Sequence, residues 1–337
     1  VNAVEPSFKL PREWKYALGG TYSFDSGYIV MADLMYSVGQ NQSIVKDLAL
    51  QQVDTLFDGR PVYARVGGRS GEYLLTNASE DAKTMSFSTS VSKEFDSGLN
   101  VQLAYAYIDA EDSNPMGSSV AGSNFGNYAR SDLNDPRPAT SNYETPHRFT
   151  FRATYKHEFV DGYATTIALL GSHNKGRPYS FTFEDNIAGD TSSDRQLLYV
   201  PTGADDPNVV FADGFDTDEF FAFVDAQGLA RGQIAKRNNN YSDWWTKFDL
   251  RVTQELPGFV KGHKAKAFFV IDNLTNLLND DWGVMYEAGF PQTVSVVNAT
   301  INEDGQYVFN EFSASEPQRR NANPSYWSMK IGVEYRF

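Results

Sequence analysis

The chain has 337 residues, a formal net charge of −14 and a mean hydropathy of −0.45. It has no cysteine, so disulfides and thiolate metal sites are excluded, and its acidic charge argues against a general nucleic-acid-binding role. No run approaches the ~18 consecutive apolar residues of a membrane-spanning helix, a result that does not exclude the alternating strands of a membrane β-barrel.

Long stretches of alternating apolar and polar residues are the main feature of the sequence. From Leu99 to Tyr107 the odd positions are apolar and the even positions are polar or small, which is the period of a strand with one apolar face. The same alternation recurs along the chain. It predicts about nine strands, at roughly 12–24, 28–40, 83–95, 99–111, 146–159, 163–174, 243–256, 264–274 and 325–337.

The connections between these strands alternate between short and long. The short ones are Asp25–Gly27, Asp96–Gly98, Asp161–Gly162 and Leu256–His263. Asp and Gly favour tight hairpins because they tolerate positive φ. The long ones, at roughly 41–82, 112–145, 175–242 and 275–324, are rich in Asn, Asp, Ser, Gly and Pro. Successive connections of an up-and-down sheet lie at opposite ends, so we expect short turns at one end and long loops at the other.

Strand length and aromatic content both point to a bilayer. Many of the predicted strands have ten or more residues, whereas soluble strands average about five or six and a tilted membrane strand needs ~9–11. Aromatic residues gather where strands end, as in the girdles of membrane barrels; examples are Trp14, Tyr28, Phe95, Trp244 and Trp327. We therefore predict an all-β, antiparallel, up-and-down transmembrane β-barrel wall. A secreted β-sandwich binding module is the soluble alternative.

One long connection is rich in carboxylates. Those between 185 and 225 are Asp185, Asp190, Asp194, Asp205, Asp206, Asp213, Asp216, Asp218, Glu219 and Asp225. Clustered carboxylates can hold Ca²⁺, but no EF-hand or nonapeptide spacing is present, so we expect a solvated acidic loop, with a bound divalent cation as the alternative. Asp216 and Glu219 have capping-box spacing, which predicts a short helix packed against other loops through Phe220, Phe223 and Val224.

Catalytic chemistry has little support, and we expect neither an enzyme nor catalytic or metal-ligating residues. The segment His157–Asp161 reads HEFVD, which begins like a zinc-protease helix. It has no second His, however, and it lies just before a tight turn. With four His in the chain, few side chains are suited to acid–base catalysis near neutral pH.

Several segments resemble known outer-membrane proteins. The C-terminal stretch NPSYWSMKIGVEYRF is similar to the terminal strand that the barrel-assembly machinery recognises, with Val333, Tyr335 and Phe337 as the matching signal. Phe8–Gly19, Arg231–Phe259 and Phe268–Tyr286 resemble the Oar-like group of TonB-dependent outer-membrane transporters. Within the last of these, IDNLTNLLN is similar to an element of the penultimate strand in this superfamily.

The resemblance implies a barrel of about 22 strands in a much longer chain. It also implies an N-terminal plug and a TonB box, neither of which is visible in residues 1–337, and a carboxypeptidase-regulatory-like domain in front. Because the first residue is Val, we expect sequence upstream of it. We expect residues 1–337 to be the C-terminal portion of the barrel and its nine strands not to close on themselves.

Charged residues alternate along two of the predicted strands and would point into a closed barrel. They are Arg148, Arg152 and Lys156 on one strand and Lys247, Asp249 and Arg251 on another. We expect ion pairs with the plug there, with substrate contact as the alternative. Tyr179, Phe181, Phe183 and Trp282 are candidate substrate-binding aromatics at the outer mouth, and they could equally pack loops together.

The resulting hypothesis is the barrel wall and substrate-capturing loops of a TonB-dependent transporter in the bacterial outer membrane. The resemblance implies peptides or proteins as substrates. The expected partners are outer-membrane lipid, the missing barrel and plug portion, the TonB–ExbB–ExbD complex and the barrel-assembly machinery, with no nucleic acid. The alternatives are a passive porin-like or adhesin-like barrel and an envelope docking barrel that binds a partner protein through its loops.

Overall fold

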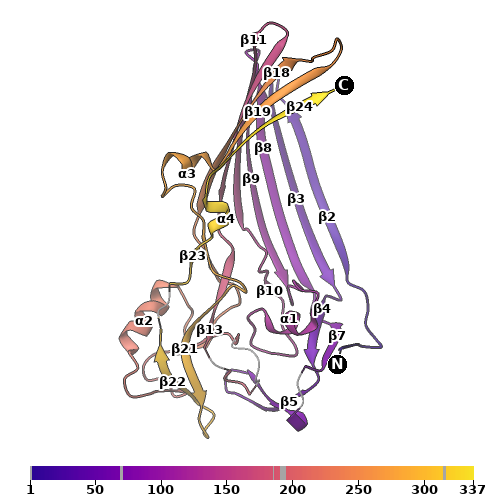
Figure 1. Cartoon of the computed structure of the whole chain (residues 1–337). Coiled ribbons are helices and arrows are strands. Elements are labelled where there is room, and N and C mark those ends of the chain that lie inside the picture. The colour runs from indigo at the N-terminus through magenta and orange to yellow at the C-terminus, as the bar shows by residue number, and fades with distance from the viewer. Residues whose placement is uncertain (1, 69–70, 185, 190–194, 314–315) are drawn as a thin grey trace.

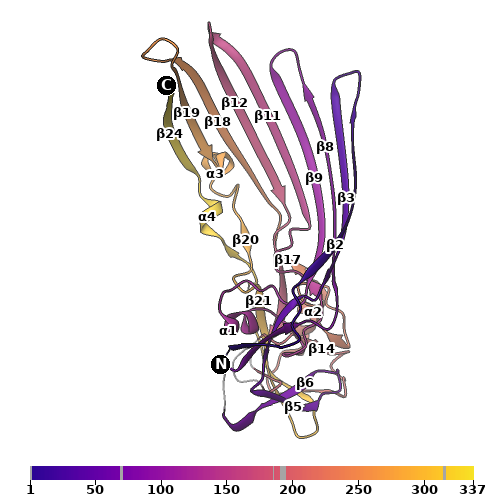
Figure 2. The same ribbon diagram turned by 90° about the vertical axis from the view of Figure 1, so that its right-hand side faces the viewer.

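A long antiparallel sheet dominates the structure, with short turns at one end and a body of packed loops at the other (Figures 1 and 2). The structure is a computed structural model, and it describes residues 2–68, 71–184, 186–189, 195–313 and 316–337. None of the helices in these residues has the length and apolar character needed to cross a bilayer.

The long sheet has nine strands in sequence order, which confirms the predicted up-and-down arrangement. These are β2 (Arg12–Ser23), β3 (Tyr28–Gln40), β8 (Ala82–Glu94), β9 (Leu99–Asp112), β11 (His147–Val160), β12 (Tyr163–Asn174), β18 (Trp245–Pro257), β19 (Lys264–Asp272) and β24 (Ser328–Arg336). Every neighbouring pair is antiparallel. A two-residue strand, β10 (Ala139–Thr140), adds to the loop end of β9 and was not predicted.

Three predicted strand ends were wrong by two or three residues. Strand β18 starts at Trp245 rather than at 243, and at the other two ends local turn chemistry interrupts the alternation. Strand β19 ends at Asp272 because Asn273 adopts a left-handed conformation, with φ of 57°, and its side chain caps α3 (Leu274–Leu278). The last strand was predicted from 325. It starts at Ser328 because α4 (Ala322–Ser325) occupies the residues before it.

Two of the repeated turns share one hydrogen-bond pattern. Phe24 N–H donates to Tyr28 O and Gly27 N–H donates to Phe24 O, and Phe95, Leu99 and Gly98 repeat this pattern in the second turn. Gly27 and Gly98 have φ of 82° and 85°, a region that favours glycine. The turn at Asp161–Gly162 is tighter, since Val160 pairs directly with Tyr163.

The register separates the sheet into an apolar face and a polar face. One row of paired residues on the apolar face runs Val30, Val91, Leu103, Phe151, Gly171 and Phe248. The adjacent row on the polar face runs Ser90, Ala104, Thr150, Ser172 and Lys247. The apolar face is uncovered by the described part of the chain: the exposed fraction is 77% for Leu18, 54% for Leu103 and 82% for Ile331.

The sheet has two open edges, as predicted. Strands β2 and β24 lie at the margins, and within the described ranges neither pairs with the other. Both run from the loop end to the turn end, so direct closure between them would be parallel (Figure 2). Their outward backbone N–H and C=O groups require partners wherever water is excluded.

Apart from the short helix predicted after Asp216, the long connections form secondary structure that was not predicted from the sequence. Their strands are β1 (Asn2–Val4), β4 (Ser43–Asp47), β5 (Leu50–Thr55), β6 (Pro61–Arg65), β7 (Tyr73–Asn77), β13 (Pro178–Phe183), β14 (Tyr199–Val200), β15 (Val209–Phe211), β16 (Gln233–Ile234), β17 (Asn240–Tyr241), β20 (Tyr286–Glu287), β21 (Thr293–Ile301), β22 (Tyr307–Phe312) and β23 (Arg319–Arg320). Besides α3 and α4, their helices are α1 (Ala121–Gly126), α2 (Thr217–Ala226) and the 3₁₀ turn η1 (Val66–Gly68). Three of the strand pairs in this loop body, β1–β7, β13–β21 and β15–β22, are parallel.

The loop body has its own hydrophobic core. Strands β13, β21 and β22 contribute Phe181, Val296 and Phe309, all at most 1% exposed. Helix α2 packs on this core through Phe220 and Val224, with Phe223 partly buried, and Asp216 Oδ1 accepts a hydrogen bond from Glu219 N–H at 2.9 Å. The predicted capped helix is therefore confirmed.

Candidate functional site

The predicted interior charges all lie on the polar face of the sheet. Arg148 and Arg152 pair across β11 and β12 with Asn174 and Leu170, and Asp249 pairs with Leu170 from the other side. A single strand, β12, therefore separates the charges of β11 from those of β18. The side chains of Arg148, Arg152 and Lys156 follow one another at intervals of about 13 Å along β11.

The charges of β18 have partners within the sheet. Lys247 Nζ lies 3.1 Å from Asp249 Oδ1, which also accepts a hydrogen bond from Asn273 N–H at 2.7 Å. The Arg251 guanidinium lies 5.3 Å from the centre of the Phe268 ring. These contacts neutralise or cover the β18 charges.

The cations of β11 have no such partners. Among the described residues, Arg148, Arg152 and Lys156 make no salt bridge and no side-chain hydrogen bond. A stripe of three exposed positive charges therefore follows β11 along the polar face. Such a stripe attracts anionic groups, and low-dielectric walls strengthen the attraction.

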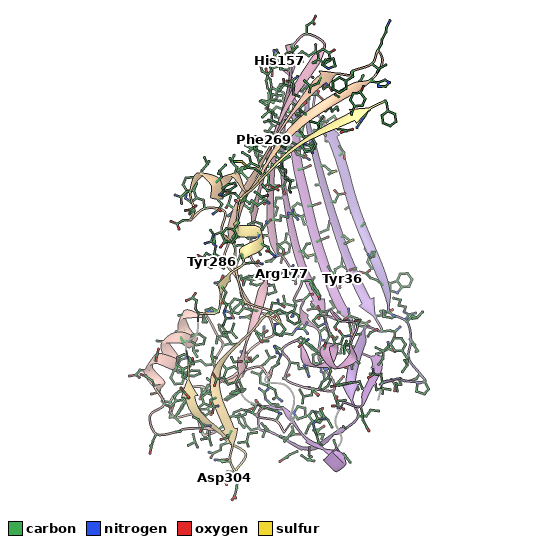
Figure 3. All side chains as sticks on the ribbon, in the orientation of Figure 1. Tyr36, His157, Arg177, Phe269, Tyr286 and Asp304 are labelled. Atoms are coloured by element: carbon green, nitrogen blue, oxygen red, sulfur yellow. The ribbon has the colours of Figure 1, made fainter. Side chains whose placement is uncertain are left out.

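A cleft of about 400 Å³ lies at the loop end of this stripe. Arg148 and Lys247 line it from the sheet, and Arg177 lines it from the segment that leads into the loop body. Figure 3 shows Arg177 where the sheet meets the loops. Its guanidinium is exposed, and it has no ion pair in the described part of the chain. The cleft therefore contains two unpaired guanidinium groups beside the Lys247–Asp249 pair.

The cleft also contains hydrogen-bonding groups. Asn174 is 7% exposed, and its Oδ1 atom receives no hydrogen bond from any described residue. Thr150 and Ser172 supply hydroxyls from β11 and β12, and Thr145 supplies one from the loop before β11. An anionic ligand with an additional N–H or O–H donor would match this set.

Sequence reasoning found Arg148 and Lys247 but missed Asn174 and Arg177. Asn174 has the same even-numbered parity as Ser172 on β12, so the alternation contained a signal for its polar-face position. Arg177 lies beyond the strand, where periodicity no longer specifies direction. Its position depends on the loop fold, which pairs Pro178 with Tyr241.

The structure does not bring the four candidate ligand-binding aromatics together. Tyr179, Phe181 and Phe183 are 3%, 1% and 0% exposed, and they pack inside the loop body on β13. These three side chains therefore pack the loops together, which was the alternative to ligand binding. Burial raises the pKa of Tyr179 to about 12, which keeps its hydroxyl neutral. Trp282 is 56% exposed and lies separately, after α3.

The acidic loop is only partly solvated. Asp206 is 3% exposed, and its carboxylate accepts hydrogen bonds from Tyr199 Oη and from the backbone N–H groups of Thr202 and Asn208, at 3.1, 2.8 and 2.9 Å. Burial opposes ionisation, but these donors hold the pKa of Asp206 below its usual range. The expectation of a fully solvated loop was therefore wrong at Asp206, because the backbone turn itself provides donors.

No calcium site is apparent in the described part of this loop. Asp185, Asp190 and Asp194 lie outside the described residues. Across the described residues, no group of three or more His, Asp or Glu side chains could hold a metal ion.

The C-terminal residues lie at the turn end of the open edge strand. Val333 pairs with Ala267 and is 71% exposed, and Phe337 is 99% exposed. Tyr335 is anchored instead, since its hydroxyl accepts a hydrogen bond from Phe259 N–H at 3.0 Å and lies 2.9 Å from His263 Nδ1. Recognition of these residues by the assembly machinery stays a prediction.

Two solved structures are among those to which the chain is similar. No protein-family model and no curated protein matches the sequence. The chain is similar to the outer membrane transporter YddB from Escherichia coli, with a TM-score of 0.47 and 11% identity over 98% of this chain and 33% of that one. It is also similar to the copper transporter OprC, with a TM-score of 0.40 and 12% identity over 98% of this chain and 32% of that one. The chain thus spans about a third of the length of each.

Proposed function

We propose that the long sheet is part of the wall of an outer-membrane β-barrel and that lipid covers its apolar face. The observation that carries this proposal is the continuous apolar face of nine strands, which the described part of the chain leaves uncovered. Burying exposed side chains such as Leu103 and Ile331 in lipid removes their apolar surface from water, at about 25 cal/mol per Å².

The dimensions of the strands support the same proposal. The nine strands have between 9 and 14 residues each, which satisfies the ~9–11 residues of a tilted membrane strand. The short turns at one end and the long, folded loops at the other fit the asymmetry of outer-membrane barrels. We assign the turn end to the periplasm and the loop body to the cell exterior.

The open edges require additional strands. Because β2 and β24 run in the same direction, antiparallel closure needs an odd number of further strands between them. We propose that residues beyond this sequence, or another chain, supply these strands. Under the Oar-like assignment, they would belong to a barrel of about 22 strands that surrounds a plug.

The proposed activity is energy-coupled import. The loop body would capture a substrate, for which the family resemblance favours a peptide or protein, and the polar face would line the path inward. The unpaired cations of β11 would pair with carboxylates of the plug or of the substrate. Energy would come from the TonB–ExbB–ExbD complex through the plug, and the barrel-assembly machinery would insert the chain through Val333, Tyr335 and Phe337. No catalytic step is required of these residues.

Fractionation and energy coupling test the proposal with the complete gene product. We expect recovery in the outer membrane, release only by detergent, and loss of substrate uptake when TonB is deleted. Recovery in aqueous buffer would contradict the membrane assignment. A steady open conductance in planar bilayers, unaffected by TonB deletion, would favour the passive porin-like barrel instead.

The packed loop body supports docking as a second candidate function. A buried core that includes Phe183, Tyr307 and Phe309 gives these loops a fixed shape, as a protein-binding surface requires. A stoichiometric partner that co-purifies with the intact protein and is lost when the loops are deleted would favour this role. Uptake that persists without the partner would favour transport.

A further inference from the structure

A groove of about 340 Å³ crosses the apolar face of the sheet from β3 to β18. Its lining includes Val30, Thr89, Tyr105, Gly171, His173 and Phe248. The groove exists because short residues alternate with large ones along the row. Gly171 has no side chain, and a Cβ there would lie 2.5 Å from the Phe248 ring that passes over it. The volume of the groove falls within the ~300–1,000 Å³ range of small-molecule sites.

A cluster of rings lies at the loop end of this groove. Trp244 stacks on His173, with ring centres 4.6 Å apart and planes 10° apart, and lies 5.8 Å from the His147 ring. Tyr105 Oη is 2.9 Å from His147 Nδ1. The rings are thus held in place by one another. Amphipathic rings prefer the depth at which lipid headgroups meet acyl chains.

The cluster also holds a cation. Lys175 also lines the cleft at the loop end of the polar face, and its Nζ lies 5.9 Å from the centre of the Trp244 ring. His173 Nδ1 is 2.7 Å from Thr246 Oγ1, so its other ring nitrogen is the one available to a ligand. Two acidic side chains act on the β9–β11 side of the cluster: Glu144 interacts with His147, and Asp109 interacts with Tyr107. Neither is part of the groove lining, and Lys175 is the cation beside Trp244 at the β12–β18 end.

We propose that this groove and ring cluster form a binding site for a phosphorylated lipid of the outer leaflet, such as lipid A. One acyl chain lies in the groove, and a headgroup phosphate accepts hydrogen bonds from Lys175 and His173. This inference rests on the proposed function, which puts the apolar face in lipid and the loop end outside. It adds a specific lipid class and a specific position to that function.

The opposite end of the sheet offers a matched cation. Lys93 Nζ lies 4.4 Å from the centre of the Tyr28 ring and 5.1 Å from that of Phe95, at the turn end. Neither lysine is part of the groove lining, but Lys175 lies beside the ring cluster at the loop end, whereas Lys93 has the same chemistry beside aromatic rings at the opposite end of the sheet. The contrast between Lys175 and Lys93 separates a specific site from general attraction to anionic lipid.

The test measures binding of lipid A and of dephosphorylated lipid A to the complete protein in detergent, by native mass spectrometry. We expect Lys175→Gln to weaken lipid A binding about fivefold, a change typical of one lysine near a charged lipid surface. The same variant should leave binding of the dephosphorylated lipid unchanged. Lys93→Gln should change neither.

A second pair of variants tests the groove. Thr89→Phe fills it and should weaken binding of both lipids, whereas Ala153→Phe, on the same face but outside the lining, should not. Equal effects of Lys175→Gln and Lys93→Gln, or no preference for the phosphorylated lipid, would overturn the proposed site. If either result were found but the protein still needed detergent, the lipid site would be wrong and the membrane assignment would stand. Wild-type protein soluble in aqueous buffer would overturn both.

Discussion

Arg60 donates a hydrogen bond from Nε to Tyr307 Oη at 2.9 Å, joining residues 247 positions apart in the loop body. The Arg60 side chain is fully buried, and its other nitrogens donate to Gln196 Oε1 at 3.1 Å and to Leu197 O at 2.6 Å. Asp58 lies 3.8 Å from Nε and is itself buried. The Arg60 guanidinium therefore holds together three of the long loops between the strands of the sheet.

We predict that Arg60→Ala loosens the loop body. Removing the guanidinium leaves the Asp58 carboxylate buried beside unpaired acceptors, a change that costs about 3–5 kcal/mol when a buried ion pair is broken. Hydrogen exchange should accelerate in β13 and β22, while the long sheet keeps its protection. Arg137→Ala is the control, because Arg137 pairs with Glu80 at an exposed site and should change little. Unchanged exchange in β22 of the Arg60 variant would contradict the prediction.

A second prediction compares neighbouring positions on β8. Val91 lies on the apolar face and Ser90 on the polar face. If lipid covers the apolar face, Val91→Arg should destabilise the assembled protein by about 2–4 kcal/mol, and Ser90→Arg should be tolerated. Urea unfolding in vesicles measures both. Equal tolerance would indicate that water covers the two faces alike.

A third prediction concerns a close approach on β24. A Cβ at Gly332 would lie 2.3 Å from the Phe268 ring, so Gly332→Ala must displace this ring from beneath Arg251. We expect about 1–3 kcal/mol of destabilisation from this overpacking. Gly20→Ala on β2 is the matched control, because the space around its Cβ is empty. A Gly332 variant as stable as the control would show that the ring moves freely.

The fourth prediction is a pH dependence at Glu144. Burial raises the pKa of this carboxyl above 4.5, although Tyr241 Oη and Ala110 N–H each donate a hydrogen bond to it at 2.6 Å. The folded state therefore binds the proton more tightly than the unfolded state. The protein's free energy of unfolding should therefore be highest below about pH 4.5. It should fall as the pH rises through the raised pKa of Glu144 in the folded state.

Hydrogen exchange around Ala110, corrected for intrinsic rates, measures this effect. In the wild type, the protection of these amides from exchange should decrease from pH 4 to pH 7. Glu144→Gln should reduce this pH dependence because the glutamine side chain stays neutral. The same slope in both proteins would assign the dependence to another group.

The long sheet could be predicted from sequence because its signal is local. Val30, Val91 and Leu103 each lie within their own alternating run, and Gly27 and Gly98 mark where such runs turn. Strand order then follows from sequence order. Two of the wrong ends, at Asn273 and Ser328, lie where a short helix replaces the alternation.

The loop body could not be predicted because its signals are non-local. Strand β13 pairs with β21 in parallel, joining Phe181 to Val294, and Arg60 reaches Tyr307. No periodicity within either segment specifies such a partner. The cleft shows the same limit: Arg148 and Lys247 follow from strand parity, whereas Arg177 reaches the cleft only through the loop fold.

Lipid contact along β11 tests the central claim most directly. Single cysteines at Phe151 and Thr150, on opposite faces, would carry a fluorophore in the complete protein, reconstituted in vesicles that contain brominated lipid. We predict strong quenching at Phe151 and little at Thr150, whatever fills the barrel interior. Equal quenching at the two positions, or none at Phe151, would contradict the assignment of the apolar face to the bilayer.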